Sequence, residues 1–327
     1  MNGLVVISPG KTPRRKQIAV ISGKGGTGKT SLVASFAALA GNAVLADCDV
    51  DAADLHLLLS PRIVHREAFT SGKRARIKPE QCTACGNCEE LCRFGAISVE
   101  VPAGVTSGPA GVAGSQAVEK TFRVDPLACE GCGVCAWFCA EDAIAFYPAQ
   151  NGEWFISETR FGPMVHAKLG VAGENSGKLV TTVRSNAEQV AEQHGLYLLL
   201  IDGSPGIGCP VIASITGTDL VLVVTEPTLS GLHDLERVAG LIRHFGIPSM
   251  VCVNKWDLNP KLSMRIEEMT RERGVGWAGK IRYDRAVTEA QVRRKTLVEY
   301  QQNGCVADIR NVWAQLEAKI TGAINEV

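Results

Sequence analysis

Short apolar runs alternate with mixed, helix-like stretches along most of the chain. Residues 17–22 read Q-I-A-V-I-S and precede an apolar helical stretch over residues 31–40. Further strand-like runs cover residues 43–46, 196–201, 220–225 and 249–254. Short apolar runs bounded by turn residues are typical of buried strands, and strands that alternate with helices form parallel sheets covered on both faces. The pattern therefore predicts an α/β fold with a doubly wound, mostly parallel sheet.

One segment departs from this alternation because cysteines, rather than apolar residues, set its pattern. Eight of the twelve cysteines form two copies of a C-x2-C-x2-C-x3-C run, and the glycine after Cys85 is matched by the glycine after Cys132. The first run is Cys82, Cys85, Cys88 and Cys92, and the second is Cys129, Cys132, Cys135 and Cys139. The chain thus contains an internal duplication that interrupts the α/β pattern.

Composition narrows the class of protein. Of 327 residues 46% are hydrophobic, and 34 basic residues balance 34 acidic ones. A neutral chain lacks the basic field that attracts nucleic acid, so we expect no nucleic-acid partner. No run approaches the roughly 18 apolar residues of a membrane span, and the first residues lack a signal-peptide pattern. We expect a cytoplasmic protein without stable membrane insertion, whose closely spaced cysteines bind metal rather than form disulfides.

The first predicted strand leads directly into a glycine-rich loop. Residues 23–30 read G-K-G-G-T-G-K-T, which fits the P-loop pattern G-x4-G-K-[ST] between a strand and a helix. Amides of such a loop surround phosphate oxygens, while Lys29 would reach the β- and γ-phosphates and the Thr30 hydroxyl would ligate Mg²⁺. The predicted nucleotide-binding residues are Gly23, Lys24, Gly25, Gly26, Thr27, Gly28, Lys29, Thr30 and Ser31.

Acidic residues follow two of the predicted strands. The run over 43–46 continues as D-C-D-V-D from Asp47, and the run over 196–201 continues as D-G-S-P-G from Asp202. The carboxyl ends of parallel strands are where α/β folds bind their ligands. We therefore expect the phosphates and Mg²⁺ at this edge, although Asp47 alone can be read as a residue that only ends its strand.

The K-G-G-x-G-K-T loop and the D-G-S-P-G segment resemble those of the MinD, ParA and nitrogenase iron-protein superfamily of deviant-Walker P-loop ATPases. The resemblance covers nearly everything after Lys16, including E-N-S-G-K-L-V from residue 174 and I-G-C-P from residue 207. It implies an ATP-dependent dimer, of two copies or with a paralogue, in which Lys24 reaches the partner's nucleotide. It also implies that Asp49, with Asp51 as second choice, orients the attacking water or a magnesium water, and that Asp202 binds Mg²⁺ through water.

The run over 249–254 leaves the choice of base open. It ends in N-K-W-D from Asn254, and read alone this is the N-K-x-D guanine motif. In the resembled superfamily an asparagine at this strand end commonly contacts adenine. We expect ATP, with GTP as the alternative.

The cysteine spacing is the one with which bacterial ferredoxins bind two [4Fe-4S] clusters. Three cysteines of one run hold one cluster, and the fourth reaches the other cluster. Cluster 1 is assigned to Cys82, Cys85, Cys88 and Cys139, and cluster 2 to Cys129, Cys132, Cys135 and Cys92. Zinc is the competing metal, although four-cysteine zinc sites usually use two C-x2-C pairs. Arg93 and Ala140 stand where ferredoxins have proline, which leaves the ligand count unchanged.

These motifs divide the chain into a P-loop ATPase domain and a small α+β, bacterial-ferredoxin-like insertion. The expected ATPase parts are residues 1–76 and 151–327, and the expected insertion is 77–150. Residues 62–76 read as a basic, turn-rich approach. Residues 101–117, rich in Gly, Ala, Pro and Ser, read as a mobile loop without chemistry.

The remaining apolar and cysteine positions read as core. Cys48, Cys209, Cys252 and Cys305 are each expected to be packed residues, although Cys209 also stands where the nitrogenase iron protein has a cluster ligand. A helical apolar stripe follows near the end of the chain, at Ile309, Val312, Trp313, Leu316, Ile320 and Ile324. Its polar face has few basic residues, which favours core packing over membrane binding.

The leading functional hypothesis joins both halves: an ATPase whose nucleotide state gates electron transfer through two [4Fe-4S] clusters to a partner protein. The first alternative is a carrier or scaffold that passes clusters or metal to apo-proteins. The second is a MinD-like cell-division positioning ATPase with redox sensing. The sequence does not identify the electron acceptor or cluster recipient.

Overall fold

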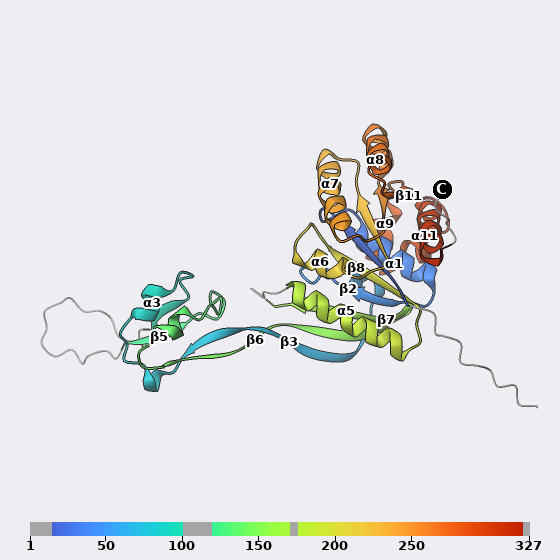
Figure 1. Cartoon of the computed structure of the whole chain (residues 1–327). Helices are drawn as coiled ribbons and strands as arrows, with labels where there is room; N and C mark the ends of the chain where they lie inside the picture. Colours follow the sequence, from blue (N-terminus) through green and yellow to red (C-terminus); the bar gives the residue numbers. More distant parts are fainter. Residues whose placement is uncertain (1–14, 101–119, 171–175, 323–327) are drawn as a thin grey trace, which may run out of the picture. The chain divides into compact units, whose positions relative to one another are not determined.

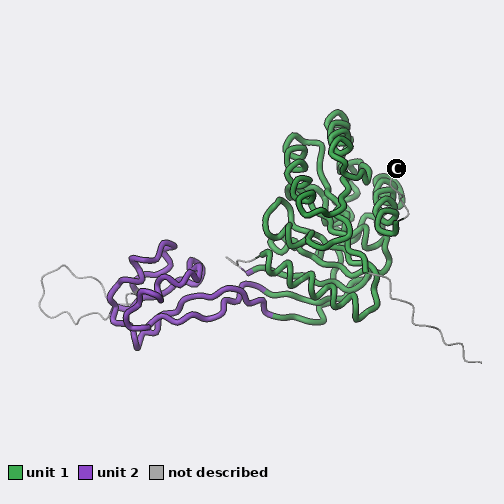
Figure 2. Tube along the Cα trace, viewed as in Figure 1, with its two compact units in different colours: residues 1–67, 153–169, 176–327 green, residues 68–152, 170–175 purple. Residues whose placement is uncertain are grey.

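A computed structural model of the chain describes residues 15–100, 120–170 and 176–322 (Figure 1). The loop expected over 101–117 lies outside these residues. The chain divides into two compact units (Figure 2). Unit 1 comprises Met1–Glu67, Glu153–Leu169 and Ser176–Val327, and unit 2 comprises Ala68–Gly152 and Gly170–Asn175. The P-loop belongs to unit 1, and both cysteine runs belong to unit 2.

A nine-stranded sheet has the order β11-β10-β9-β1-β8-β2-β7-β6-β3. From β11 to β7 every neighbouring pair is parallel. The strands are β1 Lys16–Ser22, β2 Val44–Asp47, β3 Arg62–Ile77, β6 Ile144–Thr159, β7 Gly162–Leu169, β8 Leu198–Pro205, β9 Leu220–Thr225, β10 Ser249–Asn254 and β11 Gly276–Ile281. The predicted strands over 220–225 and 249–254 are confirmed residue for residue. β1 lies between β8 and β9, and the later strands of the parallel sheet are placed on both of its sides. The strand order therefore reverses at β1, and the P-loop begins at the carboxyl end of this strand.

Helices cover both faces of this sheet (Figure 1). They are α1 Lys29–Ala40, α2 Leu55–Leu59, α5 Ser176–Gln193, α6 Cys209–Ile215, α7 Leu229–His244, α8 Pro260–Glu272, α9 Ala286–Val292, α10 Leu297–Tyr300 and α11 Cys305–Thr321. On one face Ile18 and Val20 pack in a single core with α1 and α11, where Phe36 stacks on Trp313 at 5.3 Å between ring centroids. The apolar stripe of α11 is buried as far as Ile320, which confirms core packing for its described residues. In the described ranges, no helix has the length and apolar character needed to cross a bilayer.

The basic approach to the insertion is not turn-rich, because residues 62–77 form the continuous strand β3. Between Phe69 and Ser71, and again between Ala75 and Ile77, buried and exposed residues alternate, with Ala75 and Ile77 inside and Arg76 outside. A strand turns successive side chains to opposite faces, so closely spaced arginines are compatible with it when they share the exposed face. The basic composition was therefore misread as a loop.

Unit 2 repeats one local structure. Each cysteine run leads into a short helix, α3 Asn87–Leu91 or α4 Val134–Trp137, preceded by a glycine with positive φ, Gly86 at 86° or Gly133 at 88°. The 3-10 turn Pro79–Gln81 precedes the first run, and β4 Ile97–Glu100 pairs antiparallel with β5 Thr121–Val124. The sequence duplication is thus also a structural one.

Candidate nucleotide site and cysteine cavities

The P-loop connects β1 to α1 and is held by close neighbours. Gly28, the last residue before α1, has φ 89°, a left-handed conformation that favours glycine. A Cβ on Gly28 would lie 2.5 Å from Nδ2 of Asn254, and a Cβ on Gly23 would overlap Asp234 of α7. A side chain at either position would therefore displace the loop or its neighbour.

Lys29 lies between two carboxylates from different strand ends. Its Nζ donates to Oδ1 of Asp202 at 2.5 Å and to Oδ2 of Asp49 at 3.2 Å. Burial opposes the charged form of Lys29, but Asp202 and Asp49 outweigh it and raise the pKa of the ammonium group. Burial also raises the pKa of Asp49, although Lys29 counteracts this. The group expected to bind phosphate is thus also the electrostatic partner of both predicted switch aspartates.

Two buried oxygens at this edge have no hydrogen-bond partner among the residues that the structure describes. They are Oδ2 of Asp202, whose residue is fully buried, and Oγ1 of Thr27. Buried polar atoms without partners are uncommon in folded proteins, and their presence suggests an ion, water or ligand. Thr27 lines a cavity of about 430 Å³ whose lining also includes Gly25, Lys29, Thr30, Asp49, Asp51 and Ser204. Asp202 is not among the lining residues, but its other oxygen accepts from Lys29, which is. Hydroxyl and carboxylate oxygens are the ligands that Mg²⁺ takes in proteins, so the donors fit this ion.

Asp47 supports the loop that carries Asp49. Its two carboxylate oxygens accept from the backbone N–H groups of Asp49 at 3.3 Å and Leu55 at 3.2 Å. Asp47 is fully buried and pairs in register with Asp202 of the neighbouring strand. Burial, reinforced by the Asp202 carboxylate, raises the pKa of Asp47 well above its usual range. Asp47 is thus more than a strand-end residue, because it connects β2 to the start of α2.

A second cavity, of about 250 Å³, lies beside the P-loop on the side of β10 and α9. Its lining includes Gly28, Ser31, Asn254, Lys255, Tyr283, Asp284 and Gln291. Asn254 donates from Nδ2 to the carbonyl of Thr27 at 2.8 Å. Asp257, the last residue of N-K-W-D, accepts from the backbone N–H of Tyr283 at 2.7 Å and is not among the lining residues. The aspartate that a guanine site would use is therefore engaged elsewhere.

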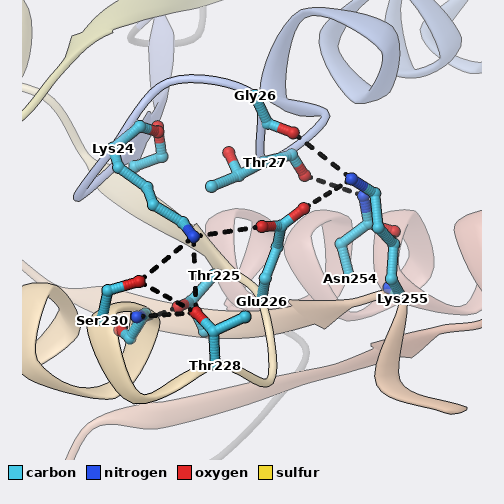
Figure 3. A network of polar contacts seen from close by, with 11 residues as sticks. Lys24, Gly26, Thr27, Thr225, Glu226, Thr228, Ser230, Asn254 and Lys255 are labelled. Carbon is cyan, nitrogen blue, oxygen red and sulfur yellow. Dashed lines mark hydrogen bonds and ion pairs between the residues drawn. The ribbon is translucent and has the colours of Figure 1, made fainter. Parts of the chain in front are cut away.

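Lys24 contacts three residues of its own chain (Figure 3). Its Nζ lies 3.3 Å from the hydroxyls of Thr228 and Ser230 and 3.4 Å from Oε2 of Glu226. The other oxygen of Glu226 accepts from Lys255 at 2.5 Å. Glu226 thus bridges the lysine of the loop variant and the lysine after Asn254.

Sequence reasoning did not name Glu226, Asp284 or Gln291. Glu226 could have been found, because it directly follows β9 at the edge where Asp49 and Asp202 were sought. Asp284 and Gln291 carried no such signal, since only the fold brings α9 and the segment before it to the P-loop.

In unit 2 the eight cysteines are distributed between two cavities. One is lined by Cys82, Cys85, Cys88 and Cys139, and the other by Cys92, Cys129, Cys132 and Cys135. Each cavity thus combines three cysteines of one run with the fourth of the other. Backbone N–H groups of Ala75 and Ala96 point at Sγ of Cys129 and Cys92, at 3.5 and 3.3 Å. Such donors stabilise thiolates that ligate metal.

These thiols do not converge on a single point. Among the described residues, no three His, Cys, Asp or Glu side chains are close enough to hold one metal ion. A zinc ion with Zn–S bonds of about 2.3 Å would hold its sulfurs roughly 3.8 Å apart. The ligands of a cubane cluster bind different iron atoms and therefore stand farther apart than the ligands of a single ion.

Of the cysteines outside the runs, Cys48, Cys252 and Cys305 are buried as expected, whereas Cys209 is exposed. The expectation of a packed Cys209 is therefore wrong. Cys209 is the first residue of α6, and the side chains in the first turn of a helix overlie the segment before it rather than the core.

The fold and site define the chain as a nucleotide-binding protein of the P-loop class. A family model described as the CobQ/CobB/MinD/ParA nucleotide binding domain matches residues 18–298. The chain belongs to this family of MinD- and ParA-like ATPases. It is 31% identical over 253 residues to the uncharacterized protein MJ0578 of Methanocaldococcus jannaschii, covering 74% of this chain and 79% of that one. It is 24% identical over 305 residues to MJ0579 of the same organism, covering 90% and 93%.

Solved structures share the fold. The cell division ATPase MinD of Pyrococcus furiosus aligns with a TM-score of 0.53 at 16% identity, covering 92% of this chain and 98% of MinD. The septum site-determining protein MinD of Pyrococcus horikoshii, complexed with Mg-ADP, aligns at 0.54 and 16%, covering 95% and 99%. These structures confirm the predicted α/β fold with its large, mostly parallel sheet, and the family model confirms the predicted relation to MinD and ParA.

Proposed function

We propose that the protein is an ATP-hydrolysing iron–sulfur protein in which nucleotide state gates electron transfer through two [4Fe-4S] clusters to a partner protein. The observation that carries this proposal is the division of the eight cysteines into two sets of four, each around its own cavity. They belong to the same chain as a P-loop whose lysine contacts Asp49 and Asp202. When bound, the clusters supply one-electron redox chemistry that no side chain here supplies.

At the nucleotide site, each proposed role follows from the chemistry of the residue. Lys29 and the loop amides bind the phosphates, and Thr30 and Asp202 hold Mg²⁺, the latter through water. Asp49 orients the attacking water, with Asp51 as second choice. Asn254 borders the base, and the engagement of Asp257 by Tyr283 favours ATP over GTP.

We further propose a dimer, of two copies or with a paralogue, in which Lys24 reaches the partner's nucleotide. Its contacts with Glu226, Thr228 and Ser230 would then be exchanged for phosphate oxygens. Lys24→Ala should leave ATP binding nearly unchanged but remove ATP-dependent dimerisation and hydrolysis. Lys29→Ala should abolish ATP binding. Hydrolysis at the wild-type rate by the Lys24 variant would contradict the cross-subunit role.

Cluster content tests the other half of the proposal. Protein purified without oxygen should contain about eight irons and eight acid-labile sulfides per chain, because two complete thiolate sets are present. Cys85→Ala and Cys132→Ala change one cavity each, so each should lower the iron content by up to half. Purified protein that contains zinc but no acid-labile sulfide would contradict the proposed [4Fe-4S] clusters.

The exposed Cys209 favours a second candidate function, a carrier that passes clusters or metal to apo-proteins. A carrier needs an accessible, labile site, and Cys209 is exposed, unlike Cys48, Cys252 and Cys305. Cys209→Ser should leave the eight irons in place under both functions. If the protein is a carrier, the same variant should also lose the transfer of clusters or metal to an apo-protein.

A further inference from the structure

The two cysteine cavities of unit 2 give their thiols the same access to solvent. The cluster 1 cavity is lined by Cys82, Cys85, Cys88 and Cys139, and the cluster 2 cavity by Cys92, Cys129, Cys132 and Cys135. In each cavity three cysteines are half-buried and one is exposed, Cys85 or Cys132. A difference between the two clusters therefore has to come from other contacts.

A backbone N–H group after the first run reaches a sulfur, and its counterpart after the second run does not. Ala96 and Ala143 each stand four positions after the last cysteine of a run, and the residue before each alanine has positive φ, 61° or 48°. The N–H of Ala96 donates to Sγ of Cys92 at 3.3 Å. Among the described residues, the N–H of Ala143 makes no such bond to Cys139. The duplication thus preserves the backbone conformation but not the bond to sulfur.

The strand β3 supplies a second donor to the same cavity. Ala75 and Phe122 each stand seven positions before the first cysteine of a run. The N–H of Ala75 donates to Sγ of Cys129 at 3.5 Å, whereas Phe122 has no bond of this kind to Cys82 within the described ranges. Both unmatched donors act on ligands of cluster 2.

The remaining N–H donors to sulfur are matched. The backbone N–H of Glu89 acts on Cys88, and that of Ala136 acts on Cys135. These two cysteines occupy corresponding positions of the two runs and line different cavities. This pair of donors therefore does not distinguish the clusters.

Charged side chains act in the same direction as the unmatched donors. Within two positions of a ligand cysteine, the cluster 1 cavity has Glu80, Glu89, Glu90 and Glu141, and the cluster 2 cavity has Glu90, Arg93 and Glu130. Reduction adds a negative charge, which carboxylates oppose and an arginine favours. All these side chains are exposed, so salt weakens their effect.

The apolar lining acts in the opposite direction. Phe94 and Phe146 line only the cluster 2 cavity, whereas Thr83 and Asn87 line only the cluster 1 cavity. Apolar surroundings disfavour added charge. However, Phe94 is 50% exposed and Cys132 is exposed, so water still reaches the cluster 2 cavity. Because the N–H groups contact the ligand sulfurs directly, they outweigh this lining.

We infer that the two clusters are inequivalent and that cluster 2 has the higher reduction potential, because the N–H groups of Ala75 and Ala96 stabilise its reduced form. The inference rests on the proposed function, which supplies the clusters. In a chain that contains one added electron, the electron leaves cluster 1 and enters cluster 2, so cluster 1 is oxidised by one electron and cluster 2 is reduced by one. No bond is formed or broken. Cluster 2 therefore stores the electron that nucleotide state gates, and cluster 1 is the relay.

Variants with a single cluster assign each potential to its cavity. Cys85→Ala removes a ligand of cluster 1, and Cys132→Ala removes the corresponding ligand of cluster 2. Electron paramagnetic resonance during a mediated dithionite titration of full-length protein measures the midpoint of the remaining cluster. The midpoint should be at least ~59 mV higher in Cys85→Ala than in Cys132→Ala, which is a tenfold difference in a one-electron equilibrium. Each variant lacks one neighbouring cluster, so the loss of that charge affects both midpoints alike.

Ala96→Pro tests the hydrogen bond itself, because proline has no N–H. Ala96 and Ala143 directly precede the strands β4 and β6, and proline is tolerated at the start of a strand. In the Cys85→Ala background, Ala96→Pro should lower the midpoint of cluster 2 toward that of cluster 1. The matched control, Ala143→Pro in the Cys132→Ala background, should leave the midpoint of cluster 1 unchanged. About four irons and four labile sulfides per chain report an intact cluster in each variant.

Equal midpoints in Cys85→Ala and Cys132→Ala, or a higher midpoint for cluster 1, would overturn the inference. Equal shifts in Ala96→Pro and Ala143→Pro would overturn the assignment of the difference to the N–H of Ala96. If proline displaces a cluster, the comparison of the two cysteine variants decides alone. Wild-type protein without iron and labile sulfide would instead overturn the proposed function together with this inference.

Discussion

The ammonium group of Lys29 contacts two carboxylates that its own chain provides, Asp49 and Asp202. Phosphate oxygens would compete with both for the same donors. Binding of a nucleotide would therefore loosen Asp49 and Asp202 together, because each loses part of its neutralising charge. A single residue thus connects the phosphate site to both predicted switches.

Gly28→Ala should disturb this site. A left-handed conformation costs a residue with a Cβ about 1–2 kcal/mol, and the new Cβ would approach Asn254 Nδ2 to 2.5 Å. We expect at least ~10-fold weaker ATP binding by fluorescence titration, since 1.4 kcal/mol is a factor of ten. Gly25→Ala is the control for stability: its Cβ would meet no heavy atom within 4 Å, so its thermal midpoint should match wild type. Equal binding by Gly28→Ala would contradict the close packing of loop and Asn254.

His166 gives the fold a dependence on pH. Burial, and to a smaller extent His56, lowers its pKa from 6.5 to about 4, and its Nε2 lies 2.8 Å from Oγ of Ser157. The unfolded chain binds the proton more readily, so stability is complete above pH 6.5 and is lost as pH falls toward 4. The loss from this group is about 3 kcal/mol.

His166→Gln keeps a hydrogen-bonding group toward Ser157 but does not titrate. Urea unfolding followed at several pH values should therefore show a smaller loss of stability between pH 6.5 and 4 in the variant than in wild type. If the stability of the variant and of wild type falls equally between pH 6.5 and 4, His166 is not the source of the pH dependence.

At the scale of elements, the turn between β6 and β7 is fastened to α2. Arg160 donates to the carbonyls of Leu58 at 3.0 Å and Leu59 at 2.8 Å, and it forms an ion pair with Glu299 at 2.7 Å. α2 follows the loop that carries Asp49 and Asp51, so this arginine links the first predicted switch to the hairpin. The last carbonyls of α2 gain partners that the helix cannot supply itself.

In unit 2 the second cysteine run packs closely against β3. A Cβ on Gly131, whose φ is 64°, would overlap the carbonyl oxygen of Lys73. Gly131→Ala should therefore displace the run and lower the iron content from about eight toward about four per chain.

Gly133→Ala separates steric overlap from backbone strain. Gly133 also has positive φ, at 88°, but a Cβ there would meet no heavy atom within 4 Å. This variant should keep most of its iron. Equal iron loss in both variants would show that backbone conformation alone, rather than contact with β3, determines cluster retention.

At the scale of the whole molecule, both cysteine cavities lie in unit 2 and the nucleotide site lies in unit 1. The strand β6 contains residues of both units, and its last residues lead into the turn that contains Arg160, which binds the end of α2. Gating requires that nucleotide bind two conformations with different affinity, and cluster redox state must then change nucleotide affinity by the same factor.

A nonhydrolysable ATP analogue with Mg²⁺ should therefore shift the cluster midpoint potential or the rate of electron transfer to a partner. Asp49→Ala or Asp202→Ala should reduce that shift, because each removes one of the groups that respond at the phosphate. Redox titration without nucleotide, with ADP and with the analogue is the measurement, and Lys29→Ala is the control that binds no nucleotide. If the cluster potentials and electron-transfer rates are the same without nucleotide, with ADP and with the analogue, the two units act independently. That result would contradict gating and favour the carrier function.

Much of the fold followed from local pattern. The strands β9 and β10, the P-loop between β1 and α1, and the buried stripe of α11 were predicted because period and turn residues are local properties of the chain. The strand β3 was not predicted, because alternation of arginine with small residues is weak evidence until one face is known to be covered.

The sequence by itself determined the chemistry: a phosphate loop, acidic residues after strands, and eight thiols in a duplicated spacing. Tertiary structure decided which of these groups meet. It brought Lys29 to Asp202, set Glu226 between Lys24 and Lys255, and left Cys209 exposed. The physical reason is that spacing constrains neighbours along a helix or strand, whereas contacts between strand ends depend on sheet order and on which helix covers which face.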